Sequence, residues 1–119
     1  MPDILARQAL TANQKFRPFA ESQRNWRFRR CPYPRGLYTI LVRTTGAAGN
    51  VFHSVLIGTT EVVQRGETQV GGTDGISPVP QTTPAHQFYA SAGDEIDLLI
   101  EETAGATPSV MVWANVEPA

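Results

Sequence analysis

One cysteine is all that the 119 residues contain, so Cys31 has no partner for an internal disulfide. No stretch approaches the roughly 20 apolar residues that a membrane-spanning helix needs, and residues 1–16 lack the apolar run of a secretory signal peptide. These absences predict a soluble protein that folds in a reducing cytoplasm without disulfides. The length suits one domain with a single core.

Side chains suited to catalysis or metal binding are also scarce. The two histidines, His53 and His86, have no partner at a metal-ligand spacing, and His53 is predicted to be a strand-end residue that bonds to backbone. Cys31 has no neighbouring base, so a small buried side chain is expected there rather than a nucleophile. The sequence therefore predicts no catalytic residue, no metal ligand and no cofactor.

Acidic residues do gather near one strand, at Asp94, Glu95 and Asp97. Glu95 and Asp97 would lie about 7 Å apart on one strand face, a separation that two glycosidase carboxylates also show. That spacing is common, so a solvated strand face is the preferred interpretation. Weak Ca²⁺ binding by the three carboxylates stays open as an alternative.

Charge is distributed unevenly along the chain. Residues 1–43 hold nine basic and two acidic residues, whereas residues 44–119 hold one basic and nine acidic residues. The two parts therefore carry +7 and −8, although the net charge is only −1. Such polarity favours association of copies or docking on a charged partner. The alternative is that strands of both parts interleave, so that the charges mix.

Helical periodicity is nearly absent, and strand signals take its place. Residues 95–101 alternate between acidic and apolar side chains, and residues 110–116 resume the apolar alternation after a turn at Gly105. Residues 36–45 and 50–58 are predicted to form a hairpin that pairs Val42 with His53. Further strands are expected at residues 25–30, 60–65 and 86–90, with a long loop over residues 71–84.

About eight strands with regular turns and no crossover helices predict an all-β protein, a two-sheet antiparallel β-sandwich. The stiff proline crossover and the long loop favour a jelly roll over a meander or an immunoglobulin-like sandwich. The predicted core is Trp26, Phe28, Tyr38, Ile40, Val42, Val55, Ile57, Ile96, Leu98, Ile100, Val110, Val112 and Val116.

The first 20 residues are predicted to be an extended N-terminal arm, with the sandwich domain over residues 21–119. Their polar, proline-interrupted composition offers little apolar area for independent order. Leu10, Phe16 and Phe19 are the anchors that a partner would bury. Each would contribute about 1.5–3 kcal/mol on burial.

Leu99, Met111 and Trp113 are expected on the outward face of the last two strands. If those strands paired about Gly105, Leu99 would lie opposite Met111, and the three side chains would form one apolar patch for self-association. The alternative is that an N-terminal segment of the same chain covers this patch. A closed three-fold ring would bring the acidic rim, Glu95 and Asp97, to basic residues of the next copy.

Those basic residues lie on the strand predicted at residues 25–30, where Arg27, Arg29 and Arg30 accompany Trp26 and Phe28. Aromatics among arginines could form a nucleic-acid platform. The alternation instead points both rings into the core and leaves only the arginines outside. They are therefore assigned, with Glu95 and Asp97, to contacts with another copy or with a large partner surface.

Several segments, taken in order, resemble small virion proteins of tailed bacteriophages: LTANQKFRPF, NWRFRRCPYP, VVQRG followed by GGTDG, TTPAHQFYASAGDEIDLLIEET and PSVMVWANVEP. The chain is similar to the jelly-roll decoration, or cement, proteins on the outside of icosahedral capsids. The resemblance implies a non-enzymatic protein, commonly trimeric, that bridges major capsid protein subunits. The alternation at residues 25–30 and the lack of a long apolar run predict no nucleic-acid or membrane partner. A carbohydrate- or receptor-binding module of a phage tail or fibre is the alternative on the same fold.

Overall fold

The protein is a sandwich of two β-sheets in the computed structural model, which describes residues 4–21, 30–46, 49–71, 78, 83 and 85–119. The first sheet contains, in order, β1 (Ile4–Ala9), β9 (Ser109–Pro118), β3 (Arg35–Thr44) and β6 (Gln69–Val70). β7 (His86–Ser91) also belongs to it and pairs with β3 along the edge that β6 shares.

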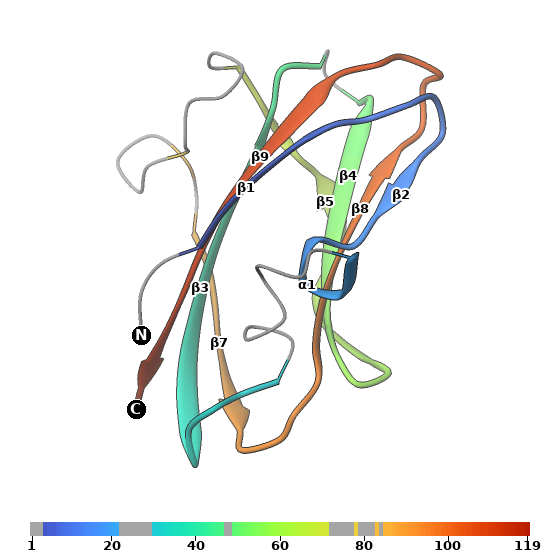
Figure 1. Ribbon diagram of the computed structural model, residues 1–119. Helices are drawn as coiled ribbons and strands as arrows, with labels where there is room; N and C mark the ends of the chain where they lie inside the picture. The colour runs from blue at the N-terminus through green and yellow to red at the C-terminus, as the bar shows by residue number, and fades with distance from the viewer. Residues whose placement is uncertain (1–3, 22–29, 47–48, 72–77, 79–82, 84) are drawn as a thin grey trace.

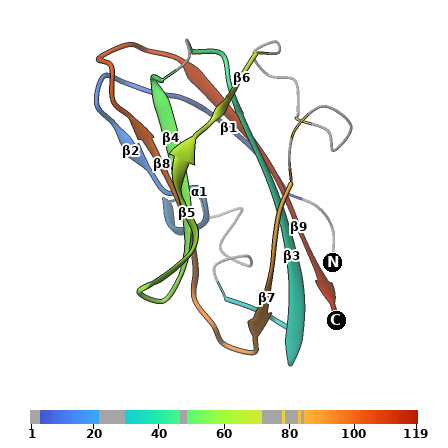
Figure 2. The same cartoon turned by 180° about the vertical axis from the view of Figure 1, so that it is seen from behind.

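The second sheet contains, in order, β2 (Lys15–Phe16), β8 (Ile96–Glu102), β4 (Val51–Ile57) and β5 (Thr60–Glu67). A single helical turn, α1 (Pro18–Glu21), follows β2. Every named pair of strands is antiparallel except β3 and β6. The predicted two-sheet antiparallel sandwich is therefore confirmed, and Figure 1 shows its two layers, which Figure 2 shows from behind.

The core lies between the sheets because alternate residues of the long strands are apolar and point inward. β8 alternates strictly, with Ile96, Leu98 and Ile100 buried. Tyr38 stacks on Phe88, with ring centroids 5.2 Å apart. Of the predicted core residues, Trp26 and Phe28 lie outside the described residues, and Ile57 is only partly buried. All the others are buried.

The hairpin predicted from residues 36–45 and 50–58 is wrong. β3 pairs with β9, β7 and β6, whereas β4 pairs with β5 and β8 in the other sheet. Both strands have one apolar face, and these faces meet across the interior instead of lying side by side. Val42 and His53, the predicted partners, consequently line the same pocket from opposite sheets.

The actual hairpin joins β4 to β5, with Ile57 opposite Thr60 and two residues at the turn. Gly58 begins that turn with a φ of 61°, a conformation that glycine adopts without strain. β5 continues through Gly66 to Glu67, two residues beyond its predicted end. The strand predicted at residues 86–90 is confirmed as β7.

The last two strands do not pair with each other, which corrects the expected register about Gly105. β8 lies between β2 and β4, and β9 lies between β1 and β3. The chain crosses from one sheet to the other between them. Leu99 accordingly lies opposite Ser54, while Met111 lies between Arg7 and Arg43.

The N-terminal residues are strands of the sandwich rather than a free arm. β1 is extended, as predicted, but it pairs with β9 over six residue pairs, from Ile4 with Ala114 to Ala9 with Ser109. The three expected anchors are buried in the protein's own core: Leu10 is 1% exposed, Phe16 8% and Phe19 0%. Leu10, Phe16 and Phe19, which were expected to be buried by a partner, are therefore part of the core of their own chain.

Strands from the two oppositely charged parts of the sequence interleave. β1 and β2 come from the basic part and pair with β9 and β8 from the acidic part. Lys15 lies opposite Glu101, and Arg17 forms an ion pair with Asp97. The interpretation in which the charges mix within one fold is therefore confirmed.

Glu102 joins the turn before β2 to the turn after β8. Its buried carboxylate accepts backbone N–H bonds from Asn13, Ala104, Gly105 and Ala106 at 2.6–3.2 Å. The bond from Asn13 contributes most, and together these bonds hold the pKa of Glu102 below its usual value. One acidic side chain thus fixes two loops that are far apart in sequence.

Candidate functional site

The predicted apolar patch of Leu99, Met111 and Trp113 is not a single surface. Leu99 lies on the outer face of the second sheet, whereas Met111 and Trp113 lie on the outer face of the first. Met111 is buried and the other two are partly buried. Their assignment to one patch depended on pairing β8 with β9, so it fails with that pairing.

The charged residues assigned to contacts between molecules already have neighbours in their own chain. Asp97 is ion-paired with Arg17, and the backbone of exposed Arg30 bridges that of Glu95. Arg27 and Arg29 lie outside the described residues, as does most of the strand predicted at residues 25–30. These contacts stay a prediction.

The acidic cluster considered for Ca²⁺ is also engaged by protein groups. The Asp94 carboxylate accepts the backbone N–H of Ser91 at 2.8 Å. With Asp97 paired to Arg17, two of the three carboxylates have local partners. Within the described ranges, no group of three or more His, Cys, Asp or Glu side chains has a metal-binding arrangement.

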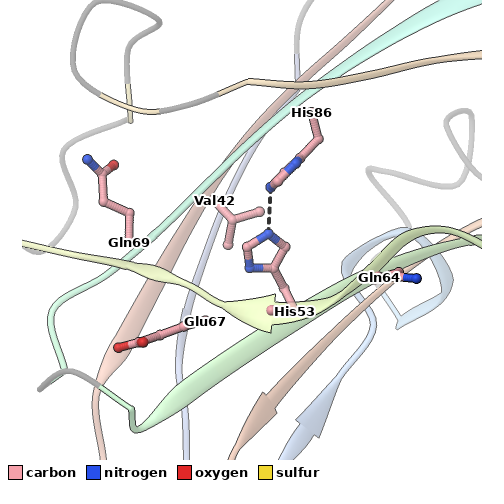
Figure 3. Close-up of a pocket in the computed structure, with 7 residues that line it drawn as sticks. Val42, His53, Gln64, Glu67, Gln69 and His86 are labelled. Atoms are coloured by element: carbon pink, nitrogen blue, oxygen red, sulfur yellow. Dashed lines mark hydrogen bonds between the residues drawn. The ribbon is translucent and has the colours of Figure 1, made fainter.

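The clearest constellation of chemical groups is one that the sequence did not predict, the pair of histidines. His53 points inward from β4 of the second sheet, and His86 points inward from β7 of the first. Their Nε2 atoms are 2.7 Å apart, and their ring centroids are 4.8 Å apart (Figure 3). A direct imidazole–imidazole hydrogen bond therefore spans the two sheets.

A pocket of about 180 Å³ opens beside this pair. It is lined by Val42, His53, Gln64, Gly66, Glu67, Gln69 and His86. Figure 3 shows the two rings meeting across the interior, while the Glu67 carboxylate points away from them. That carboxylate accepts the backbone N–H of Gly49 at 2.5 Å. The histidines are thus the polar groups that face each other at this site.

Thr68 orients the inner histidine. Its hydroxyl oxygen is 2.8 Å from Nδ1 of His53, and its backbone N–H donates to the carbonyl of Val51 at 2.9 Å. Since Nδ1 is bonded to a fixed hydroxyl, the His53 ring holds its other nitrogen toward His86. One proton is then shared along the contact between the two Nε2 atoms.

Burial keeps both imidazoles neutral. His53 is 5% exposed, and loss of hydration lowers its pKa to about 4, with a smaller contribution from the proximity of His86. Burial also lowers the pKa of His86. At neutral pH the site therefore presents nitrogen lone pairs and an N–H group, not cations.

Sequence reasoning missed this site because it placed Val42 and His53 side by side in one sheet. The sequence does predict that the His53 side chain points inward, because residues 51, 53 and 55 share one face of the strand and Val51 and Val55 are apolar. What was missing was the strand order, which brings residues 33 positions apart to one point. Spacing rules for metal ligands do not capture such a pair.

No protein-family model matches the chain, and no curated protein matches it significantly. Among the described residues, no helix is long and apolar enough to cross a membrane.

Proposed function

We propose that this protein is a non-enzymatic virion structural protein that decorates an icosahedral phage capsid and stabilises it by bridging capsid subunits. The observation that carries the proposal is the order of strands in the sandwich. The resemblance of the sequence to capsid decoration proteins points the same way.

The strand order supports a jelly roll. One sheet runs β1, β9, β3, β7 and the other runs β2, β8, β4, β5, with β6 as a short addition. Apart from the β4–β5 hairpin and the link from β6 to β7, each step between consecutive named strands crosses from one sheet to the other. That alternation is the arrangement of two Greek keys, which recurs in viral capsid and lectin domains.

The partners we infer are a major capsid protein and further copies of this chain, as a homotrimer on the capsid exterior. Among the side chains whose exposure the structure describes, only Val62, Val70 and Tyr89 are large, apolar and substantially exposed. A surface with so few apolar patches favours docking through polar and charged contacts on a large partner.

Co-sedimentation with capsids tests the proposal. The chain is mixed with purified capsids assembled from the major capsid protein of the same genome, and the pellet is analysed for a fixed ratio of the two proteins. Bound protein should also raise the temperature at which the shells break. A genome without a capsid gene, or shells that leave the protein in the supernatant, would contradict the proposal.

The second candidate, a carbohydrate-binding module of a phage tail or fibre, is favoured by one residue. Tyr89 on β7 is 54% exposed and carries the Arg35 guanidinium 4.2 Å from its ring centroid. Such an exposed ring can stack on a sugar through the face that the Arg35 guanidinium does not cover. Retention on immobilised host polysaccharide that is lost in Tyr89→Ala would favour this candidate over capsid decoration.

A further inference from the structure

We propose that His53 and His86 form a binding site for one divalent transition-metal ion, of the class of Zn²⁺, Co²⁺ and Ni²⁺, which joins the two sheets of the sandwich. The site is independent of capsid decoration, and its test needs only the isolated protein.

The geometry requires little movement. The two Nε2 atoms are 2.7 Å apart. A tetrahedral ion that holds each nitrogen at about 2.0–2.1 Å separates the two nitrogens by about 3.3 Å. The rings would therefore move apart by roughly 0.6 Å. The proton between them, carried by Nε2 of His86 when Nδ1 of His53 donates to Thr68, would move to Nδ1 of His86, so that both neutral rings present an Nε2 lone pair to the ion. Staggered side-chain rotamers on two facing strands can absorb such a shift without a change of fold.

The surroundings of His53 are those of a metal ligand. Thr68 is buried, and its hydroxyl lies 2.8 Å from Nδ1. When that hydroxyl accepts the Nδ1 proton, the Nε2 lone pair of His53 is directed at His86. Metal-binding histidines almost always donate the N–H of their second ring nitrogen to a carboxylate, a backbone carbonyl or water, which fixes both tautomer and orientation. The hydroxyl oxygen of Thr68 would take that role here.

Imidazole ligands suit zinc, copper, nickel and cobalt, whereas Ca²⁺ and Mg²⁺ require oxygen. The described part of the chain brings no third His, Cys, Asp or Glu to the pair. Water entering the pocket would complete the coordination.

The ion would act as a clip between β4 and β7. These strands belong to different sheets and share no backbone ladder. An ion that binds the folded protein and not the unfolded chain stabilises the folded state in proportion to the logarithm of its excess over Kd. We therefore expect the melting temperature to rise by a few degrees as Zn²⁺ is added.

Cobalt and copper report the ligands directly. Protein freed of metal with EDTA and dialysed against Co²⁺ should bind one ion per chain and show the visible absorption of a four- or five-coordinate site. The electron paramagnetic resonance spectrum of the Cu²⁺ form should show coupling to two imidazole nitrogens. Because the sequence has no third histidine, two nitrogens of this kind identify the pair without any mutation.

Variants give the second arm of the test. His86→Gln removes the more accessible ring and should lower Zn²⁺ affinity at least 10-fold, while Gln64→Ala should change it only slightly. The upward shift of Tm with Zn²⁺ should disappear in His86→Gln. Absence of stoichiometric binding in wild type at about 100 µM Zn²⁺ would overturn the proposal. Unchanged affinity in His86→Gln, or a copper spectrum without two imidazoles, would do the same.

Discussion

At the scale of single residues, the His53 imidazole makes folding sensitive to mild acid. In the unfolded chain it titrates near 6.5, whereas burial lowers its pKa in the folded protein to about 4. Between these two pKa values His53 is protonated in the unfolded state but not in the folded state, so the free energy of unfolding falls as pH is lowered. The contribution of His53 to the free energy of unfolding is therefore fully present above pH 6.5 and is lost as the pH falls towards 4.

We expect a loss of about 3 kcal/mol from this group across the window. Urea unfolding at several pH values in EDTA measures it. His86 adds in the same direction, since burial lowers its pKa too, while the Glu67 carboxylate is bonded to Gly49 and turned away. The readout is the difference in slope between wild type and His53→Gln. Parallel slopes for the two proteins would contradict the assignment.

Gly36 marks a second point where one residue controls stability. A Cβ at this position would lie 2.8 Å from Sγ of Cys31 and 3.1 Å from Val116. Gly36→Ala should therefore destabilise the protein by about 1–3 kcal/mol through overpacking. Chemical denaturation checks this.

A matched control is Gly66→Ala, whose Cβ would meet only ordinary contacts at 3.7 Å. Its free energy of unfolding should stay within about 0.5 kcal/mol of wild type. The double variant Gly36→Ala with Cys31→Ala removes the sulfur and should recover part of the loss. Equal destabilisation by the two glycine substitutions would show that the clash is not the cause.

At the scale of elements, the N-terminal segment decides whether the sandwich closes. Leu10 is 1% exposed, and its backbone N–H donates to the carbonyl of Pro108 at 2.8 Å. Leu10→Ala should cost about 2–5 kcal/mol, because it leaves a cavity in the core. A free arm would predict no change.

Lys15→Ala is the control within the same segment, since its side chain is exposed beside Glu101. That substitution should change the free energy of unfolding by less than about 1 kcal/mol. Deletion of residues 1–15 would remove β1 and expose one edge of β9. We expect the deleted chain to lose cooperative unfolding, as measured by circular dichroism. A stable, cooperative deletion variant would restore the arm hypothesis.

Most strands could be predicted from the sequence, but their partners could not. The alternation around Ile96, Leu98 and Ile100 fixes which face is buried, and it does so whatever strand lies alongside. Two strands that each have one apolar face can bury those faces either as neighbours in one sheet or by packing against each other from two sheets. Periodicity does not distinguish these outcomes, so both predicted hairpins at residues 36–58 and 95–116 were wrong.

The N-terminal segment was misjudged for a related reason. Its short strands are only two and six residues long, and Pro18 interrupts the pattern. Composition alone therefore indicated an independent arm, although Leu10, Phe16 and Phe19 fill the core. The histidine pair could not be predicted either, because only the strand order shows that His53 and His86 meet.

At the scale of the whole molecule, the positions of Leu99 and Trp113 constrain assembly. They lie on the outer faces of opposite sheets. A contact between those two faces would stack copies in a row, whereas a ring of three closes only through surfaces at an angle to each other. The proposed trimer can therefore use at most one of the two faces directly.

Sedimentation equilibrium should give a mass three times the 13.0 kDa of the chain. We expect Trp113→Glu to lower that mass, because Trp113 is partly exposed beside buried Met111 and Leu41. Leu99→Glu, on the other sheet, should keep it. A monomeric wild type would contradict the trimer, and loss of the trimer in Leu99→Glu alone would move the interface to the second sheet.

The pairing of early strands with late ones also determines when the protein can fold. β9 is the central partner of both β1 and β3, and β8 is that of β2 and β4. On the ribosome, β1, β2 and one edge each of β3 and β4 are therefore made long before the backbone groups that will bond to them. Folding must wait for release of residues 96–118, and contacts of such long sequence separation form in milliseconds to seconds rather than microseconds. Until then, the nascent chain exposes apolar strands that chaperones can bind.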